Sequence, residues 1–205
     1  MKTLNYYCKY LLLFTIVFVN SACADNDSSK LKSIIANSES KKSLPSDRAV
    51  MRKILGWPDS CEETFNFPTS GLKFFKQSNE LYIAQVICTY GSYQGMSLFY
   101  KLDLSKEKVT TQQLKFTVYN QDKKPTIESS IWGNVLTSST FDKFTILNLY
   151  SGYGHCGSLT EYDLSGEQPK TTQLKMQPNC DTQNKVREPE KWHVEKLGSD
   201  HLKSR

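Results

Sequence analysis

The chain has 205 residues, a formal net charge of +5 and an aromatic content of 12%. Its basic residues are scattered and interleaved with acidic ones, which excludes the concentrated basic face that nucleic-acid binding requires. No nucleic-acid partner is therefore expected.

The N-terminus predicts an export signal over residues 1–24. Two lysines precede a ten-residue apolar run (10–19) that is too short to span a bilayer. Two processing sites remain open. Ala22-Cys23-Ala24 is an A-x-A site that would release a soluble protein, whereas Ser21-Ala22-Cys23 resembles a bacterial lipoprotein box with Cys23 lipidated. Both interpretations predict a periplasmic domain, and membrane attachment follows only if Cys23 carries lipid.

The segment after the signal, 25–45, is polar and rich in Ser and Lys, which predicts a flexible linker. Its few apolar residues would form a transient helical turn at most: Leu31, Ile34 and Ile35. A short α-helix is expected next. Ser46 or Asp47 can cap it, Gly56 can adopt the left-handed conformation that ends it, and Pro58 prevents continuation.

Two stretches further along the chain are similar to each other. Residues 103–116 and 163–176 align without a gap and are identical at eight of fourteen positions. The match continues upstream to two further tyrosine pairs, Tyr90 with Tyr150 and Tyr93 with Tyr153. This similarity predicts internal repeats at about 62–121 and 122–181, within a β domain that spans 46–197. Residues 198–205 are predicted to be a disordered tail.

Each repeat predicts at least three antiparallel strands in meander order. Residues 81–90 and 143–150 are apolar on both faces, as central strands are, and place Tyr90 and Tyr150 toward the interior. A second strand covers 97–104, and a third passes through Leu114, Phe116 and Val118 or through Leu174 and Met176. Two copies are too few for a solenoid or propeller. We expect a mainly β fold, an antiparallel sandwich or barrel of two pseudo-twofold-related repeats, preceded by one short α-helix.

Four cysteines lie beyond the signal: Cys61, Cys88, Cys156 and Cys180. An even number in an oxidising compartment predicts two disulfides. Four cysteines allow three pairings, and because each repeat holds one adjacent pair, Cys61–Cys88 and Cys156–Cys180 are favoured. No zinc-binding spacing occurs, so neither a metal nor a cofactor is predicted.

The loops after the two central strands are the best candidates for recognition. They read YGSYQG over 90–95 and YSGYGH over 150–155. Glycine permits close approach of a ligand, and tyrosine offers an apolar face with a hydrogen-bonding tip. The candidate binding residues are Tyr93, Gln94, Tyr153 and His155. The alternative is that these side chains are structural, since tyrosine-rich hairpins are common in β proteins.

Motifs for catalysis are absent from the sequence: it has no G-x-S-x-G, H-E-x-x-H, P-loop or Rossmann pattern. No catalytic residue is therefore predicted, and an enzyme is the less favoured alternative.

A dispersed pattern of Cys, Gly and aromatic residues carries a resemblance. Its parts are Gly56-Trp57-Pro58 before Cys61, Cys88 before Tyr93-Gln94-Gly95, Trp132, the run 150–157 with Tyr162, and Pro178 and Cys180 before Trp192. Together they resemble a family of exported proteobacterial proteins defined by a domain of unknown function, over about Asp47 to Trp192. The resemblance implies a periplasmic, disulfide-bonded domain and brings no activity or catalytic residue.

Two classes of function therefore compete. The first is a periplasmic binding or inhibitor module that recognises an envelope protein or glycan through the paired Tyr/Gly loops. The second is an envelope hydrolase with an unrecognised site, or a structural accessory protein anchored by lipid at Cys23. An enzyme needs convergent acids or histidines, whereas a binding module needs an exposed aromatic patch. The sequence leaves the oligomeric state open.

Overall fold

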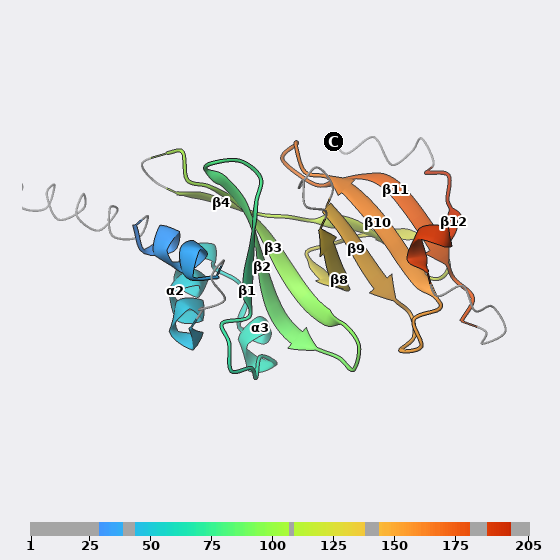
Figure 1. Cartoon of the computed structure of the whole chain (residues 1–205), viewed down its shortest axis with the longest axis horizontal. Helices are drawn as coiled ribbons and strands as arrows, with labels where there is room; N and C mark the ends of the chain where they lie inside the picture. Colours follow the sequence, from blue (N-terminus) through green and yellow to red (C-terminus); the bar gives the residue numbers. More distant parts are fainter. Residues whose placement is uncertain (1–28, 39–43, 107–108, 138–143, 181–187, 198–205) are drawn as a thin grey trace, which may run out of the picture.

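A computed structural model describes residues 29–38, 44–106, 109–137, 144–180 and 188–197. The predicted export signal, the lipidation site Cys23 and the predicted tail 198–205 lie outside these residues. Within them the chain is mainly β with antiparallel sheets, as the sequence predicts (Figure 1). Several helices precede the first strand, where the sequence predicts one short α-helix. No helix in the described ranges is long and apolar enough to cross a membrane.

The first sheet is an antiparallel meander in the order β1-β2-β3-β4. Its strands are β1 (Leu72–Lys76), β2 (Leu81–Tyr90), β3 (Gly95–Asp103) and β4 (Thr110–Gln113). β7 (Ser130–Trp132) also pairs with β3, beyond the end of β4. The predicted central strand 81–90 has the bounds of β2. An irregularity between Ile87 and Thr89 shifts its register to β3.

The second sheet runs in the order β12-β11-β10-β9-β8. Its strands are β8 (Asn134–Thr137), β9 (Phe144–Leu149), β10 (Gly157–Asp163), β11 (Lys170–Gln177) and β12 (His193–Val194). β8 to β11 repeat the meander of β1 to β4, and the turns that follow β3 and β10 are alike. Asp103 accepts a hydrogen bond from the Ser105 N–H at 2.9 Å, and Asp163 accepts one from the Ser165 N–H at 2.8 Å. The duplication itself stays a prediction.

The segment from β7 to β8 passes from one sheet to the other. Gly133 lies between the two strands with a φ of +146°, and a Cβ at this position would lie 2.7 Å from the Leu147 carbonyl oxygen. Glycine is the residue that allows this turn and this close approach.

The strand predicted through Leu114 to Val118 is divided in the structure. β4 ends at Gln113, and the chain leaves the first sheet to form a separate ribbon of β5 (Phe116–Tyr119) and β6 (Pro125–Glu128).

The two sheets and the ribbon enclose one apolar core. It contains Ile83 and Phe99 from the first sheet, Phe116 from the ribbon, and Phe144, Ile146 and Tyr162 from the second sheet. Phe99, Phe116 and Phe144 pack with ring centroids 5.3 to 5.9 Å apart. This arrangement explains why β4 and β5 separate, since the break allows Phe116 to enter the core between the sheets.

A second apolar core lies on the other face of the first sheet, beneath helices (Figure 1). Residues 29–38 are helical, followed by α2 (Pro45–Leu55) and α3 (Asp59–Glu63). α2 is the helix that the sequence predicts, and it ends at Gly56 with a φ of +68°. The prediction of a flexible linker over 25–45 is wrong for 29–38. Three residues at helical spacing are fully packed there: Leu31, Ile34 and Ile35 are 0%, 3% and 4% exposed.

Two disulfides have the favoured pairing, Cys61–Cys88 and Cys156–Cys180. The first joins α3 to β2, so it fastens the helices to the first sheet. The second closes the meander of the second sheet, from the start of β10 to the segment beyond β11. Each disulfide therefore stabilises one half of the molecule.

Candidate functional site

The two predicted loops lie side by side at one end of the molecule. The hairpins β2–β3 and β9–β10 both turn at the lower edge of Figure 1. The ring of Tyr93 lies 3.1 Å from the position that a Cβ would occupy at Gly152. A Cβ at position 152 would make a tight contact with this ring, so glycine favours the close approach of the two loops.

Gln94 has a structural position, contrary to its predicted role in binding. It is 8% exposed, and its amide reaches from the first loop to the end of β9. Its Oε1 accepts a hydrogen bond from the Leu149 N–H at 2.8 Å, and its Nε2 donates to the Leu149 carbonyl at 3.1 Å and to Asn148 Oδ1 at 3.0 Å. Donors and acceptors used in this way are not available to a ligand.

His155 is also structural, contrary to its predicted role. It is 4% exposed, and its Nε2 lies 2.8 Å from the carbonyl oxygen of Cys180. A carbonyl only accepts, so Nε2 carries the proton and donates. This hydrogen bond lies next to the Cys156–Cys180 disulfide and holds the segment after β11 against the loop.

Four aromatic side chains are exposed at this end of the sheets, and we call them the aromatic end: Tyr90, Tyr93, Trp132 and Tyr153. Their exposed fractions are 47%, 42%, 42% and 73%. Tyr93 and Tyr153 were predicted from the sequence. Tyr90 was expected to face the interior, but the irregularity that precedes it in β2 brings it out to the surface, where its ring lies nearly perpendicular to that of Phe67. Burial of part of its surface raises the pKa of the Tyr90 hydroxyl.

Tyr150, the counterpart of Tyr90 in the second loop, remains partly buried. Its hydroxyl donates to the Tyr119 carbonyl at 2.8 Å, which connects β9 to the ribbon. Burial raises the pKa of this hydroxyl above its ordinary value. The equivalent tyrosines of the two loops thus differ in role, and only Tyr90 contributes a ring to the aromatic end.

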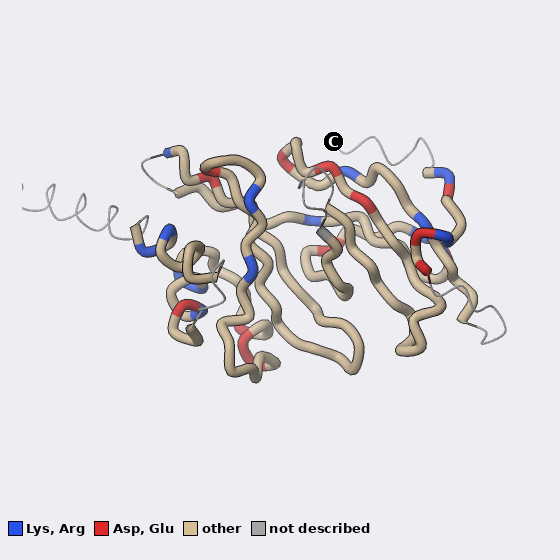
Figure 2. Tube along the Cα trace, viewed as in Figure 1, with Lys and Arg blue, Asp and Glu red and all other residues tan. Residues whose placement is uncertain are grey.

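The segments that carry the four rings are uncharged. The stretches 89–98, 130–137 and 144–160, which include them, contain no Lys, Arg, Asp or Glu. Figure 2 shows both hairpin ends without charged residues, whereas charges gather on the helices and at the opposite end. The polar groups nearby are neutral side chains such as Ser92 and Ser151 in the loops and Asn134 at the start of β8.

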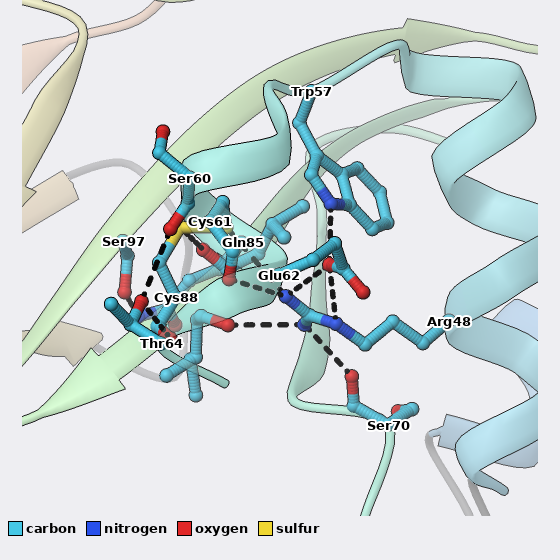
Figure 3. The surroundings of a disulfide bond; sticks show 12 residues. Arg48, Trp57, Ser60, Cys61, Glu62, Thr64, Ser70, Gln85, Cys88 and Ser97 are labelled. Atoms are coloured by element: carbon cyan, nitrogen blue, oxygen red, sulfur yellow. Dashed lines mark hydrogen bonds and ion pairs between the residues drawn. A yellow bond between two sulfur atoms is a disulfide. The ribbon is translucent and has the colours of Figure 1, made fainter. Parts of the chain in front are cut away.

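A polar cluster around Arg48 was not predicted from the sequence. Arg48 is 4% exposed and lies beside the Cys61–Cys88 disulfide (Figure 3). Its Nε and Nη2 contact Glu62 Oε1 at 2.8 and 2.7 Å, and its Nη1 donates to the carbonyls of Ser70 and Ile87. The sequence pattern that could have indicated this cluster is helical spacing: Arg48 lies on the same face of α2 as the buried Met51 and Leu55.

The Arg48 cluster joins α2 and α3 to the first sheet. The guanidinium also lies over the ring of Phe65, 3.6 Å from its centroid. Trp57 Nε1 donates to Glu62 Oε1 at 2.7 Å. Burial raises the pKa of Glu62, but the hydrogen bonds from Arg48 and Trp57 and the charge of Arg48 outweigh it and hold that pKa below its ordinary value of 4.5. The charged groups of the cluster thus bind each other.

Within the described parts of the chain, no group of three or more His, Cys, Asp and Glu side chains lies close enough to hold a metal ion. The four side chains of the aromatic end are rings that can stack and exchange neutral hydrogen bonds. Comparison with known proteins gives no match to any family model, to any curated protein or to any solved structure.

Proposed function

We propose that the protein is a periplasmic binding or inhibitor-type module that recognises an envelope protein or glycan through the aromatic end. The observation that supports this is the clustering of exposed rings. Eight large hydrophobic side chains are exposed among the described residues, and four of them are aromatic. These four lie at the end of β2, in the two loops and on β7, which pairs with the start of β3. Soluble proteins rarely expose such a cluster without a partner for it.

The compartment is part of the proposal. Two disulfides, one in each half of the molecule, favour an oxidising environment outside the cytoplasm. The periplasm is the compartment that the predicted export signal and the resemblance indicate. Attachment to a membrane through Cys23 remains a separate prediction.

Tyr93 suits recognition because it is held in place before a partner binds. Its ring lies against Gly152 of the neighbouring loop, and Gln94 fixes the loop that carries Tyr93 to the end of β9 through hydrogen bonds with Leu149. Side chains that are already ordered lose little conformational entropy on binding. Tyrosine and tryptophan are also the residues most often found as binding hot spots.

Affinity capture from an envelope extract tests the proposal. The mature domain and an Ile127→Ala variant should retain the same partner, because Ile127 is 71% exposed but lies on β6, in the separate ribbon. A Tyr153→Ala variant should retain less of it. If a variant with all four rings replaced by alanine retains every partner of the unmodified domain while remaining folded, the proposal is wrong.

A further inference from the structure

We propose that the outer edge of β6 is a self-association surface, on which two copies of the chain pair their β6 strands antiparallel about Thr126. The two ribbons, each of two strands, would then form one four-stranded sheet across a twofold axis. The proposal is independent of the aromatic end. It is carried by the direction of the main-chain groups of β6 and by the match between its side chains and those of a second copy.

The inner edge of the ribbon is closed by the second sheet. The hydroxyl of Tyr162, on β10, donates to the Thr117 carbonyl at 2.8 Å. The hydroxyl of Tyr150, which follows β9, donates to the Tyr119 carbonyl at 2.8 Å. In an antiparallel pair, successive residues direct their main-chain groups alternately toward and away from the partner strand. These two carbonyls of β5 therefore face away from β6, and β6 is the outer strand.

The register of the ribbon determines which groups of β6 face outward. Thr117 pairs with Ile127, and Tyr119 pairs with Pro125. Because neither pair exchanges hydrogen bonds, the main-chain groups of Ile127 and the carbonyl of Pro125 are directed to the outer edge. Proline, which has no N–H, is found in sheets at such edge positions. Among the described residues β6 pairs with β5 alone, and Ile127 is 71% exposed.

A second copy of β6 complements this edge. In antiparallel pairing about Thr126, each Ile127 N–H donates to the Pro125 carbonyl of the other copy. The Ile127 side chain lies opposite Pro125, and the two Thr126 side chains lie opposite each other. Lys124 lies opposite Glu128 on both sides of the axis. Apolar, Thr–Thr and opposite-charge pairs are among the cross-strand pairs that stabilise sheets.

The two charges favour this partner and this direction. A parallel copy would place Lys124 beside Lys124 and Glu128 beside Glu128, whereas the antiparallel copy pairs opposite charges. Both side chains are exposed in the single chain. Lys124 Nζ lies 3.4 Å from the exposed Asp122 carboxylate, an ion pair too weak in water to hold it there. An edge of four residues is short, so we expect weak association, with a dissociation constant of about 10–100 µM.

Sedimentation velocity of the mature domain, at about 10 to 500 µM, tests the proposal. We expect a monomer–dimer equilibrium. Lys124→Glu and Glu128→Lys should each weaken dimerisation about tenfold or more, because each places like charges opposite each other. An equimolar mixture of these two variants should regain the affinity of the unmodified domain, since opposite charges then face each other at both positions. Lys73→Glu, an equal change of charge at an exposed position of β1, serves as control and should dimerise like the unmodified domain.

Three results would overturn the proposal. The first is an unmodified domain that stays monomeric at the highest concentration. The second is a Lys124→Glu variant that dimerises as strongly as Lys73→Glu, because the contact would then lie elsewhere. The third is a mixture of Lys124→Glu and Glu128→Lys that stays as weak as either variant alone. The altered side chains are exposed, so the thermal unfolding of every variant should match that of the unmodified domain, and loss of dimer cannot come from unfolding.

Discussion

Gln94 and Leu149 exchange two hydrogen bonds, as residues of neighbouring strands do, although one partner is a side-chain amide. The bonds measure 2.8 and 3.1 Å and join the loop of the first sheet to the last residue of β9. The side chain of Gln94 thus connects two sheets whose strands are not hydrogen-bonded to each other at this point. The position of the aromatic end depends on this contact.

Gln94→Ala should lower the free energy of unfolding by about 1–3 kcal/mol, because it leaves buried polar groups of Leu149 and Asn148 without their partner. Gln94→Glu should not restore stability, since a carboxylate can accept from the Leu149 N–H but cannot donate to its carbonyl. Denaturant titration measures both. Ser92→Ala, in the exposed part of the same loop, serves as control and should change stability by less than about 0.5 kcal/mol. Equal stability of Gln94→Ala and Ser92→Ala would contradict the structural role of Gln94.

Arg48→Met should lower the free energy of unfolding by about 3–5 kcal/mol, because Glu62 and two main-chain carbonyls lose their buried donor. Arg48→Lys should recover little, since an ammonium cannot reach Glu62 and both carbonyls as the guanidinium fork does. Arg52 provides a matched control on the same helix. Its partner Asp59 is 81% exposed, so Arg52→Met should cost at most about 1 kcal/mol. Equal free energies of unfolding for Arg48→Met and Arg52→Met, measured by chemical denaturation, would show that the contacts of Arg48 do not stabilise the fold.

The lowered pKa of Glu62 predicts that the free energy of unfolding depends on pH. Its pKa is below 4.5 in the folded protein, so the unfolded chain binds a proton more readily. The stability from this carboxylate is therefore fully present above about pH 4.5 and is lost as the pH falls through the lower, folded pKa. The unfolding free energies of the unmodified protein and Glu62→Gln should differ by a constant amount from pH 6 to pH 5 and converge at lower pH. A difference that stays constant down to pH 3 would contradict the role of this pair.

The helix over residues 29–38 should be needed for full stability. Leu31 is fully buried, so Leu31→Ala should cost about 2–5 kcal/mol, in the range for large apolar residues cut to alanine in a core. Lys32 is exposed on the same helix, and Lys32→Ala should cost less than about 0.5 kcal/mol. Thermal and denaturant unfolding distinguish the two. An unchanged midpoint for Leu31→Ala would mean that this helix does not pack against the sheet in solution.

Local patterns were enough to predict the strands, the helix before them and the disulfides. The β2 sequence, apolar on both faces, predicts a buried strand wherever it packs, and the adjacent cysteines within each meander pair as expected. The helix over 29–38 was missed because its apolar residues are few in a polar stretch, and composition outweighed their spacing. Their positions, Leu31, Ile34 and Ile35, were the signal that could have found it.

The site was less predictable because its residues are defined by partners distant in sequence. Nothing near Gln94 indicates Leu149, and nothing near His155 indicates the carbonyl of Cys180, so both could be taken for ligand-binding groups. Tyr90 was placed on the wrong side because period-two alternation fails at an irregularity in the strand. Trp132 was noticed only as part of a resemblance, since its exposure depends on how β7 pairs with β3.

The measurement that tests the central claim most directly is the dissociation constant of the captured partner for the unmodified domain and for Tyr93→Ala with Tyr153→Ala, beside the unfolding of each. Both side chains are exposed, so the double variant should keep its free energy of unfolding within about 1 kcal/mol. Its affinity should fall by more than about tenfold, as for loss of aromatic hot spots. A folded double variant that binds with unchanged affinity would show that recognition takes place elsewhere on the molecule.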